Sequence, residues 1–267
     1  MKKILIFVVL AAVFTTVSCK NPFLQSMLEG ENASSGPGTI SAPYVEGGAS
    51  LILSPDKKNI YIGVVTADSL PVNVEGCTQT FIPNNSGIVL NASGTKVVLK
   101  GKIMQLNCQN NQLAALNVQG CSALQSLYCN DNQLISLNVQ GCSALHFLDC
   151  QYNRLTSLNM QGCSALWRLF CYNNQLTLLN VQGCSGLYWL DCWKNKLDAD
   201  AFISIFNALP DCPTWYRGCC TLYSTGAGEE NCTDFTFPSS LQAAFNGAKA
   251  KNWKMYKQPE SGDAQEI

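Results

Sequence analysis

Hydrophobic and polar residues alternate in a pattern that repeats along the middle of the chain. Within one copy, Leu127 and Cys129 alternate with Ser126, Tyr128 and Asn130. This period of two predicts a strand with one buried face. Equivalent cysteines are each 21 residues apart, at Cys108, Cys129, Cys150, Cys171 and Cys192. A fixed period of this length predicts a solenoid in which each copy forms one coil.

One coil reads L-x-x-L-x-C-x-x-N-x-L-x-x-L-N-V-x-G-C-S-x. One strand per coil, stacked at about 4.8 Å, predicts a parallel sheet along one side. Residues 137–141 supply the return path and leave no room for a long helix. The glycine of each coil indicates a turn with positive φ or a close backbone approach, at Gly120, Gly141, Gly162 and Gly183.

An asparagine follows the strand of each coil at a fixed position. An inward amide there can both donate to and accept from backbone groups that the turn leaves unpaired. We therefore predict a structural role for this set, which comprises Asn111, Asn132, Asn153, Asn174 and Asn195.

The repeat resembles the leucine-rich repeat family. The residues that carry the resemblance are Leu124, Leu127, Cys129, Asn132 and Leu134, with cysteine in place of the usual third leucine. The short coil and this cysteine are most similar to the repeats of internalin-type bacterial surface proteins. The resemblance covers residues 103–197. It implies an α/β solenoid with a parallel sheet on its concave face, and a lipoprotein displayed on the bacterial cell surface.

The first 18 residues have the pattern of a secretory signal peptide. Two lysines precede an apolar run from Ile4 to Phe14, which is too short to span a bilayer. Ser18 before Cys19 resembles the lipobox of bacterial lipoproteins, which implies lipidation at Cys19; plain secretion is the alternative. We expect an exported protein at the outer membrane or cell surface, in contact with the membrane only through this lipid.

The repeats are flanked by segments of different composition. Residues 19–42 combine proline, glycine and serine with little periodicity and predict a flexible linker. Short β-rich runs separated by turn signals predict an antiparallel β-rich cap over residues 43–102. A cap of helices and strands is predicted for residues 198–257. Its first helix is indicated by Asp198, which can cap the amphipathic pattern that Pro210 ends. Residues 258–267 are expected to be a disordered tail.

The chain contains 15 cysteines, most of them in two regular series within the repeat. Neighbouring equivalent cysteines would have parallel Cβ vectors about 4.8 Å apart, whereas a disulfide needs about 3.8 Å. We predict buried, reduced thiols rather than a metal site, since no C-x-x-C pair is present. Apart from Cys19, five cysteines lie outside the series, and a disulfide remains open among them: Cys77, Cys212, Cys219, Cys220 and Cys232.

The coils differ most at the outward positions of their strands, where aromatic residues accumulate from the third coil onward. Tyr, Trp and Arg dominate interaction hot spots, and exposed aromatic rows cost solubility. The alternative is that the rings only stack on one another along the sheet. The predicted binding residues are Tyr128, Phe147, Asp149, Arg168, Phe170, Tyr172, Trp189, Asp191 and Trp193, with Tyr152, Trp167 and Tyr188 nearby.

Composition and motifs favour binding over catalysis. The formal net charge is −1, which does not indicate a nucleic-acid partner. The only histidine is His146, and no motif of a hydrolase, metalloprotease or nucleotide-binding site occurs, so no cofactor or metal is expected. The sequence predicts an adhesion or binding module for a protein or peptide. A glycan ligand, or a structural cell-envelope spacer without a ligand, are the alternatives.

Overall fold

A computed structural model describes residues 40–213 and 215–267. Residues 40–267 form one compact unit. The predicted signal peptide, Cys19 and most of the linker lie outside the described residues. The predicted linker ended at residue 42, but Ala42 is already buried, and its carbonyl oxygen accepts a hydrogen bond from Asn117. Among the described helices, none has the length and apolar character needed to cross a membrane.

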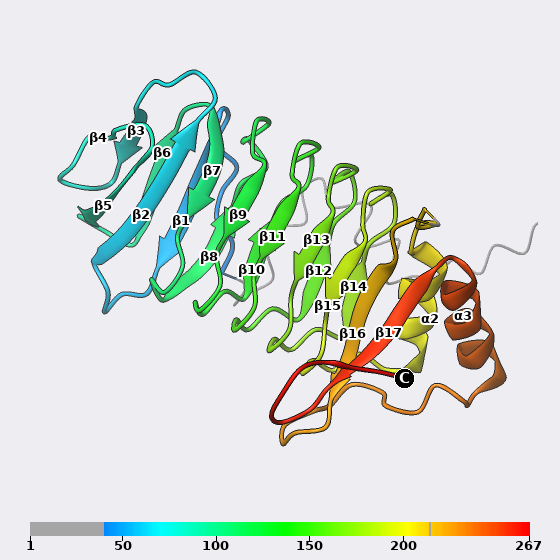
Figure 1. Ribbon diagram of the computed structural model, residues 1–267. Coiled ribbons are helices and arrows are strands. Elements are labelled where there is room, and N and C mark those ends of the chain that lie inside the picture. Colours follow the sequence, from blue (N-terminus) through cyan, green and yellow to red (C-terminus); the bar gives the residue numbers. More distant parts are fainter. Residues whose placement is uncertain (1–39, 214) are drawn as a thin grey trace, which may run out of the picture. The chain divides into compact units, whose positions relative to one another are not determined.

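The chain is folded mainly as strands in parallel and mixed sheets (Figure 1). The largest sheet has ten strands in the order β18-β17-β16-β15-β13-β11-β9-β7-β2-β5. One strand from each repeat lies in its centre, in parallel register with the equivalent residues of the neighbouring repeats. These strands are β7 (Ile103–Asn107), β9 (Ser126–Tyr128), β11 (Phe147–Asp149), β13 (Arg168–Phe170) and β15 (Trp189–Asp191).

The first four repeats also have a second strand in their return segments, where the sequence predicted only one strand per coil. The second strands are β8 (Leu113–Asn117), β10 (Ser136–Asn138), β12 (Ser157–Asn159) and β14 (Leu178–Asn180). They pair in parallel as β8 with β10 and as β12 with β14. In β12 and β14 the central leucine, Leu158 or Leu179, is buried between two half-buried residues, so three residues suffice for the period of two.

The predicted antiparallel unit is present before the repeats. It comprises β1 (Gly48–Leu53), β2 (Asn59–Thr66), β3 (Val72–Glu75), β4 (Phe81–Ile82), β5 (Ser86–Asn91) and β6 (Lys96–Lys100). β1 pairs antiparallel with β8, and β2 pairs antiparallel with β7. Both strands of the first repeat are therefore covered, and neither presents an open edge on this side.

The C-terminal region contains α2 (Ala199–Ala208), β16 (Gly218–Ser224), α3 (Ser239–Ala250) and β17 (Trp253–Gln258). As predicted, the Asp198 side chain caps α2 by accepting from the amide of Ala201 at 2.9 Å. The predicted disordered tail is not disordered throughout: β18 (Gln265–Glu266) pairs antiparallel with β17. Glu266 forms an ion pair with Lys254, and the amide of Ile267 donates to the carbonyl of Met255.

The core is a stack of equivalent side chains. Leu127 and Leu148 are fully buried, as are Cys129 and Cys150 beside them. Burial raises the pKa of the Cys108 thiol to about 12, so the thiols of the series pack as small neutral hydrophobic groups.

The inward asparagines make the hydrogen bonds that the sequence predicted. Asn153 Oδ1 accepts from the amide of Leu134 at 2.9 Å, and its Nδ2 donates to the carbonyls of Cys129 and Cys150 at 3.0 Å. Each amide thus joins its own coil to the preceding one. We call the set Asn111, Asn132, Asn153, Asn174 and Asn195 the asparagine ladder.

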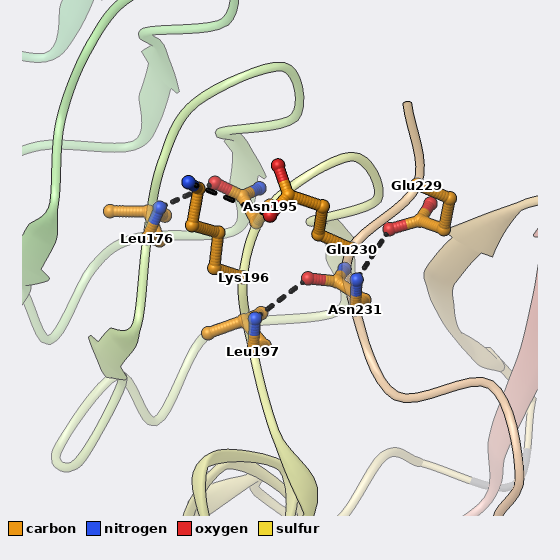
Figure 2. Close-up of polar contacts among 7 residues, drawn as sticks. All are labelled: Leu176, Asn195, Lys196, Leu197, Glu229, Glu230 and Asn231. Carbon is orange, nitrogen blue, oxygen red and sulfur yellow. Dashed lines mark hydrogen bonds and ion pairs between the residues drawn. The ribbon is translucent and has the colours of Figure 1, made fainter. Parts of the chain in front are cut away.

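The asparagine ladder continues into both flanking regions. Asn111 accepts from the amide of Tyr61 and donates to its carbonyl, which binds β2. At the other end, Asn231 Oδ1 accepts from the amide of Leu197 at 2.9 Å, as Asn195 accepts from Leu176 (Figure 2). Asn231 lies after β16 and outside the 21-residue period, so the period does not predict its role.

The recurring glycines meet both predicted requirements. Gly141, Gly162 and Gly183 have φ between +78° and +87°. At Gly120 a Cβ atom would collide with the carbonyl oxygen of Val45.

We expect Asn153→Ala to lower the free energy of unfolding by about 3 kcal/mol, because it leaves a buried amide and buried carbonyls without their partner. Chemical denaturation measures the change. Asn159→Ala is the matched control in the same repeat: Asn159 is half-buried on β12 and accepts from Gln161 and Asn180. It should cost about 1 kcal/mol or less. Equal losses would contradict a special role for the ladder.

Candidate functional site

The structure brings the nine predicted binding residues together on β9, β11, β13, β15 and the residues that follow them. Strand register sets Phe147, Arg168 and Trp189 side by side in one row. A second row contains Tyr128, Asp149, Phe170 and Asp191. We call the surface formed by all nine the strand face: Tyr128, Phe147, Asp149, Arg168, Phe170, Tyr172, Trp189, Asp191 and Trp193.

The aromatic rings of the strand face contact one another from strand to strand. Ring centroids are 5.0 Å apart for Tyr128 and Phe147, 5.5 Å for Phe147 and Phe170, and 6.2 Å for Phe170 and Trp189. Tyr172 and Trp193 are stacked with their planes 10° apart at 4.3 Å. These contacts hold the rings in fixed positions. All of these rings are half-buried, so each retains surface for a ligand.

Two carboxyl groups lie among these rings. Asp149 is only 8% exposed, and this burial raises its pKa to about 6. Hydrogen bonds from Gln151 lower the pKa, but their effect is smaller than that of burial. Asp191 accepts from Trp189 Nε1 at 3.0 Å, and burial also raises its pKa.

Arg168 is the positive group of the strand face. Its guanidinium carbon lies 5.2 Å from the ring centroids of both Trp167 and Trp189. Within the described residues, Arg168 forms no ion pair with Asp149 or Asp191. The Arg168 guanidinium is therefore not neutralised by either carboxylate of the strand face.

Buried polar atoms without a hydrogen-bond partner concentrate at this surface. Among the described residues, all side chains with such an atom belong to the outward strand positions or to the turn directly after them. They are Asn130, Gln151, Arg168, Asn173 and Asp191. An unpaired buried polar group costs about 1–3 kcal/mol. Stability alone does not explain their presence on one face.

The residue before each ladder asparagine has a left-handed backbone conformation. Asn110, Asp131 and Asn173 are residue types that tolerate it, whereas Tyr152 has φ of +51° and Lys194 has φ of +50°. Both contact the strand face: the Tyr152 ring lies 5.6 Å from Tyr172, and Lys194 Nζ lies 5.5 Å from the ring centroid of Trp193. In the sequence, these two residues occupy the position at which other repeats have Asn or Asp, which is the signal that distinguishes them.

Among the described residues, no group of three or more His, Cys, Asp or Glu side chains is arranged to hold a metal ion. His146, the only histidine, is exposed beside the strand face.

No protein-family model matches the chain, and no curated protein is significantly similar to it.

The raised pKa of Asp149 predicts a stability that falls with rising pH. The pKa of the Asp149 carboxyl is raised from its ordinary value of 3.8 to about 6 in the folded state. Within the window between these two pH values the folded state therefore binds more protons than the unfolded state. Stability is highest below the window and decreases through it. Relative to Asp149→Asn, the wild type should lose about 2 kcal/mol across it. Denaturation at a series of pH values measures this, and parallel curves for the two proteins would contradict it.

The left-handed conformation of Tyr152 gives a second prediction. Tyr152→Asn and Tyr152→Ala both remove the ring contact with Tyr172, but asparagine tolerates this conformation better. The free energy of unfolding of Tyr152→Asn should therefore exceed that of Tyr152→Ala by about 1 kcal/mol. Chemical denaturation measures the difference. Equal stability of the two variants would show that the backbone at this position is not strained.

Proposed function

We propose that the chain is a leucine-rich repeat solenoid whose strand face binds a protein or peptide. The resemblance of residues 103–197 to that family and the in-register parallel strands support the fold. The observation that carries the function is the strand face itself. It combines half-exposed aromatic rings, an arginine, and buried polar atoms that lack partners.

These features are those of interaction hot spots. Tyr, Trp and Arg are the residues that most often dominate binding energy, and they act best where neighbouring groups exclude water. The ring contacts across β9 to β15 fix the side chains before binding, so little conformational entropy is lost on association. The proposed activity is binding rather than catalysis, and it needs no cofactor.

A glycan is the second candidate ligand for this surface. Trp189 Nε1 and the Asp191 carboxylate are already joined by a hydrogen bond at 3.0 Å. A ring face beside a carboxylate can stack on a sugar and accept from its hydroxyls. A cell-envelope spacer without a ligand is the third candidate.

We further propose that the protein is exported and anchored by a lipid on Cys19 at the outer membrane or cell surface. This rests on the pattern of residues 1–19, with two lysines, an apolar run and a small residue before the cysteine. In that arrangement, residues 20–39 separate the anchor from the folded unit that begins at Ile40.

A selection from a random peptide library displayed on phage, with the full chain as bait, tests the proposed binding. Enriched peptides should bind the wild type and lose at least about tenfold in affinity for the Trp189→Ala/Trp193→Ala double variant. Because both rings contact neighbours, we also expect the double variant to lose about 1–2 kcal/mol of stability. Circular dichroism confirms that it is folded at the assay temperature.

Tyr44→Ala is the control, because Tyr44 is an aromatic residue outside the strand face and 57% exposed. It should leave peptide binding unchanged. Enrichment of peptides that bind the double variant as well as the wild type would exclude the strand face as the site. Failure to enrich any peptide would count against a peptide ligand.

A further inference from the structure

A second aromatic group lies next to the strand face. Trp167 and Tyr188 occupy equivalent positions directly before β13 and β15, and Trp215 and Tyr216 come from the segment between α2 and β16. Ring centroids are 5.5 Å apart for Trp167 and Tyr188 and 4.5 Å apart for Tyr188 and Tyr216, with planes 73° and 77° apart. Rings at such angles form a corner, not a closed stack.

These four rings line a hollow. It has a volume of about 400 Å³, and Ser185 and Asp211 contribute polar groups to its wall. A neighbouring hollow of about 590 Å³ is lined by Gln125, Ser126 and His146, and by Tyr128, Phe147 and Arg168 of the strand face. Trp167 lines both. Each volume lies within the usual range for small-molecule sites.

Core packing does not account for this group. Trp215 is 83% exposed, Trp167 41% and Tyr216 38%. Rings this exposed contribute little to folding, and a cluster of them on a surface indicates a binding site.

The charges around the two hollows favour a neutral ligand. Asp211 contributes a negative group on one side of Trp167, and Arg168 a positive group on the other, with its guanidinium 5.2 Å from the Trp167 ring centroid. Arg168 also lies 6.0 Å from the Tyr188 centroid, which opposes a second cation on these rings. A quaternary ammonium ligand is therefore disfavoured, and so is a strongly anionic one.

A sugar has the complementary chemistry. Its C–H faces carry partial positive charge and pack on the negative faces of aromatic rings. Its hydroxyls both donate and accept, which suits the Gln125 amide, the Ser185 hydroxyl and the Asp211 carboxylate. Two hollows that share one ring suit a ligand of at least two linked rings.

We propose that the two hollows form a binding site for a neutral oligosaccharide of hexopyranose units, with Trp167 between successive sugars. This site is separate from the peptide-binding function proposed for the strand face. It lies at the N-terminal ends of the repeat strands and adjoins the strand face, because Tyr128, Phe147 and Arg168 also line the larger hollow. Trp167, Tyr188, Trp215 and Tyr216 lie outside the strand face.

Isothermal titration of the full chain with a panel of neutral oligosaccharides tests the site. The panel contains cellohexaose, maltohexaose, mannohexaose and chitohexaose, each titrated to millimolar concentration. At least one should bind, and Trp167→Ala and Trp215→Ala should each weaken it at least about tenfold. Trp215 is so exposed that its variant should fold like the wild type, which circular dichroism checks.

Two controls separate this site from the strand face. Phe237→Ala removes another ring, 77% exposed, outside the group and should leave sugar binding unchanged. Trp193→Ala should impair peptide binding at the strand face but not sugar binding. The inference is overturned if no sugar of the panel binds, if binding survives both Trp167→Ala and Trp215→Ala, or if tetramethylammonium binds there instead.

Discussion

The asparagine ladder is the interaction on which the rest of the structure depends. The turn after each repeat strand leaves backbone amides and carbonyls unpaired inside the protein, where water cannot reach them. A single side-chain amide satisfies groups in two coils at once, as Asn153 does for Leu134, Cys129 and Cys150. Each coil therefore relies on the following one, and the last coil needs a partner from outside the repeat. Asn231 is that partner: it satisfies the amide of Leu197 and the carbonyl of Cys192.

The ladder also determines what the outer surface can do. It fixes the register of the parallel strands, which lie about 4.8 Å apart. Aromatic side chains at equivalent positions then meet at contact distance, as Phe147 and Phe170 do at 5.5 Å. The inward residues maintain this spacing whatever the outward residues are. The outward positions can therefore carry groups that add little to stability, such as the buried Asp149 and the left-handed Tyr152.

Much of this arrangement could be predicted from the sequence, because the period reports local geometry directly. The alternation around Leu127 and Cys129 predicted the strand, and the position of Asn153 predicted its hydrogen bonds. The second strands of the first four repeats were not predicted, because so short a segment around an inward leucine has the pattern of a simple return path. Asn231 and the hollow at Trp167 depend on residues of the C-terminal region, which lies outside the 21-residue period. No period relates Trp215 to Trp167, so their proximity could not be predicted from the spacing.

The identical register between successive repeats has a consequence for how this protein can change. β1 and β2 bind only the first repeat, and β16 and Asn231 bind only the last. Between them, the repeat strands β7 to β15 pair in the same register and the ladder asparagines make equivalent hydrogen bonds at each junction. Duplication or loss of one 21-residue unit would therefore create no new kind of junction and would leave both ends intact. The length of the surface that this protein presents is adjustable in whole units, independently of the residues displayed on it.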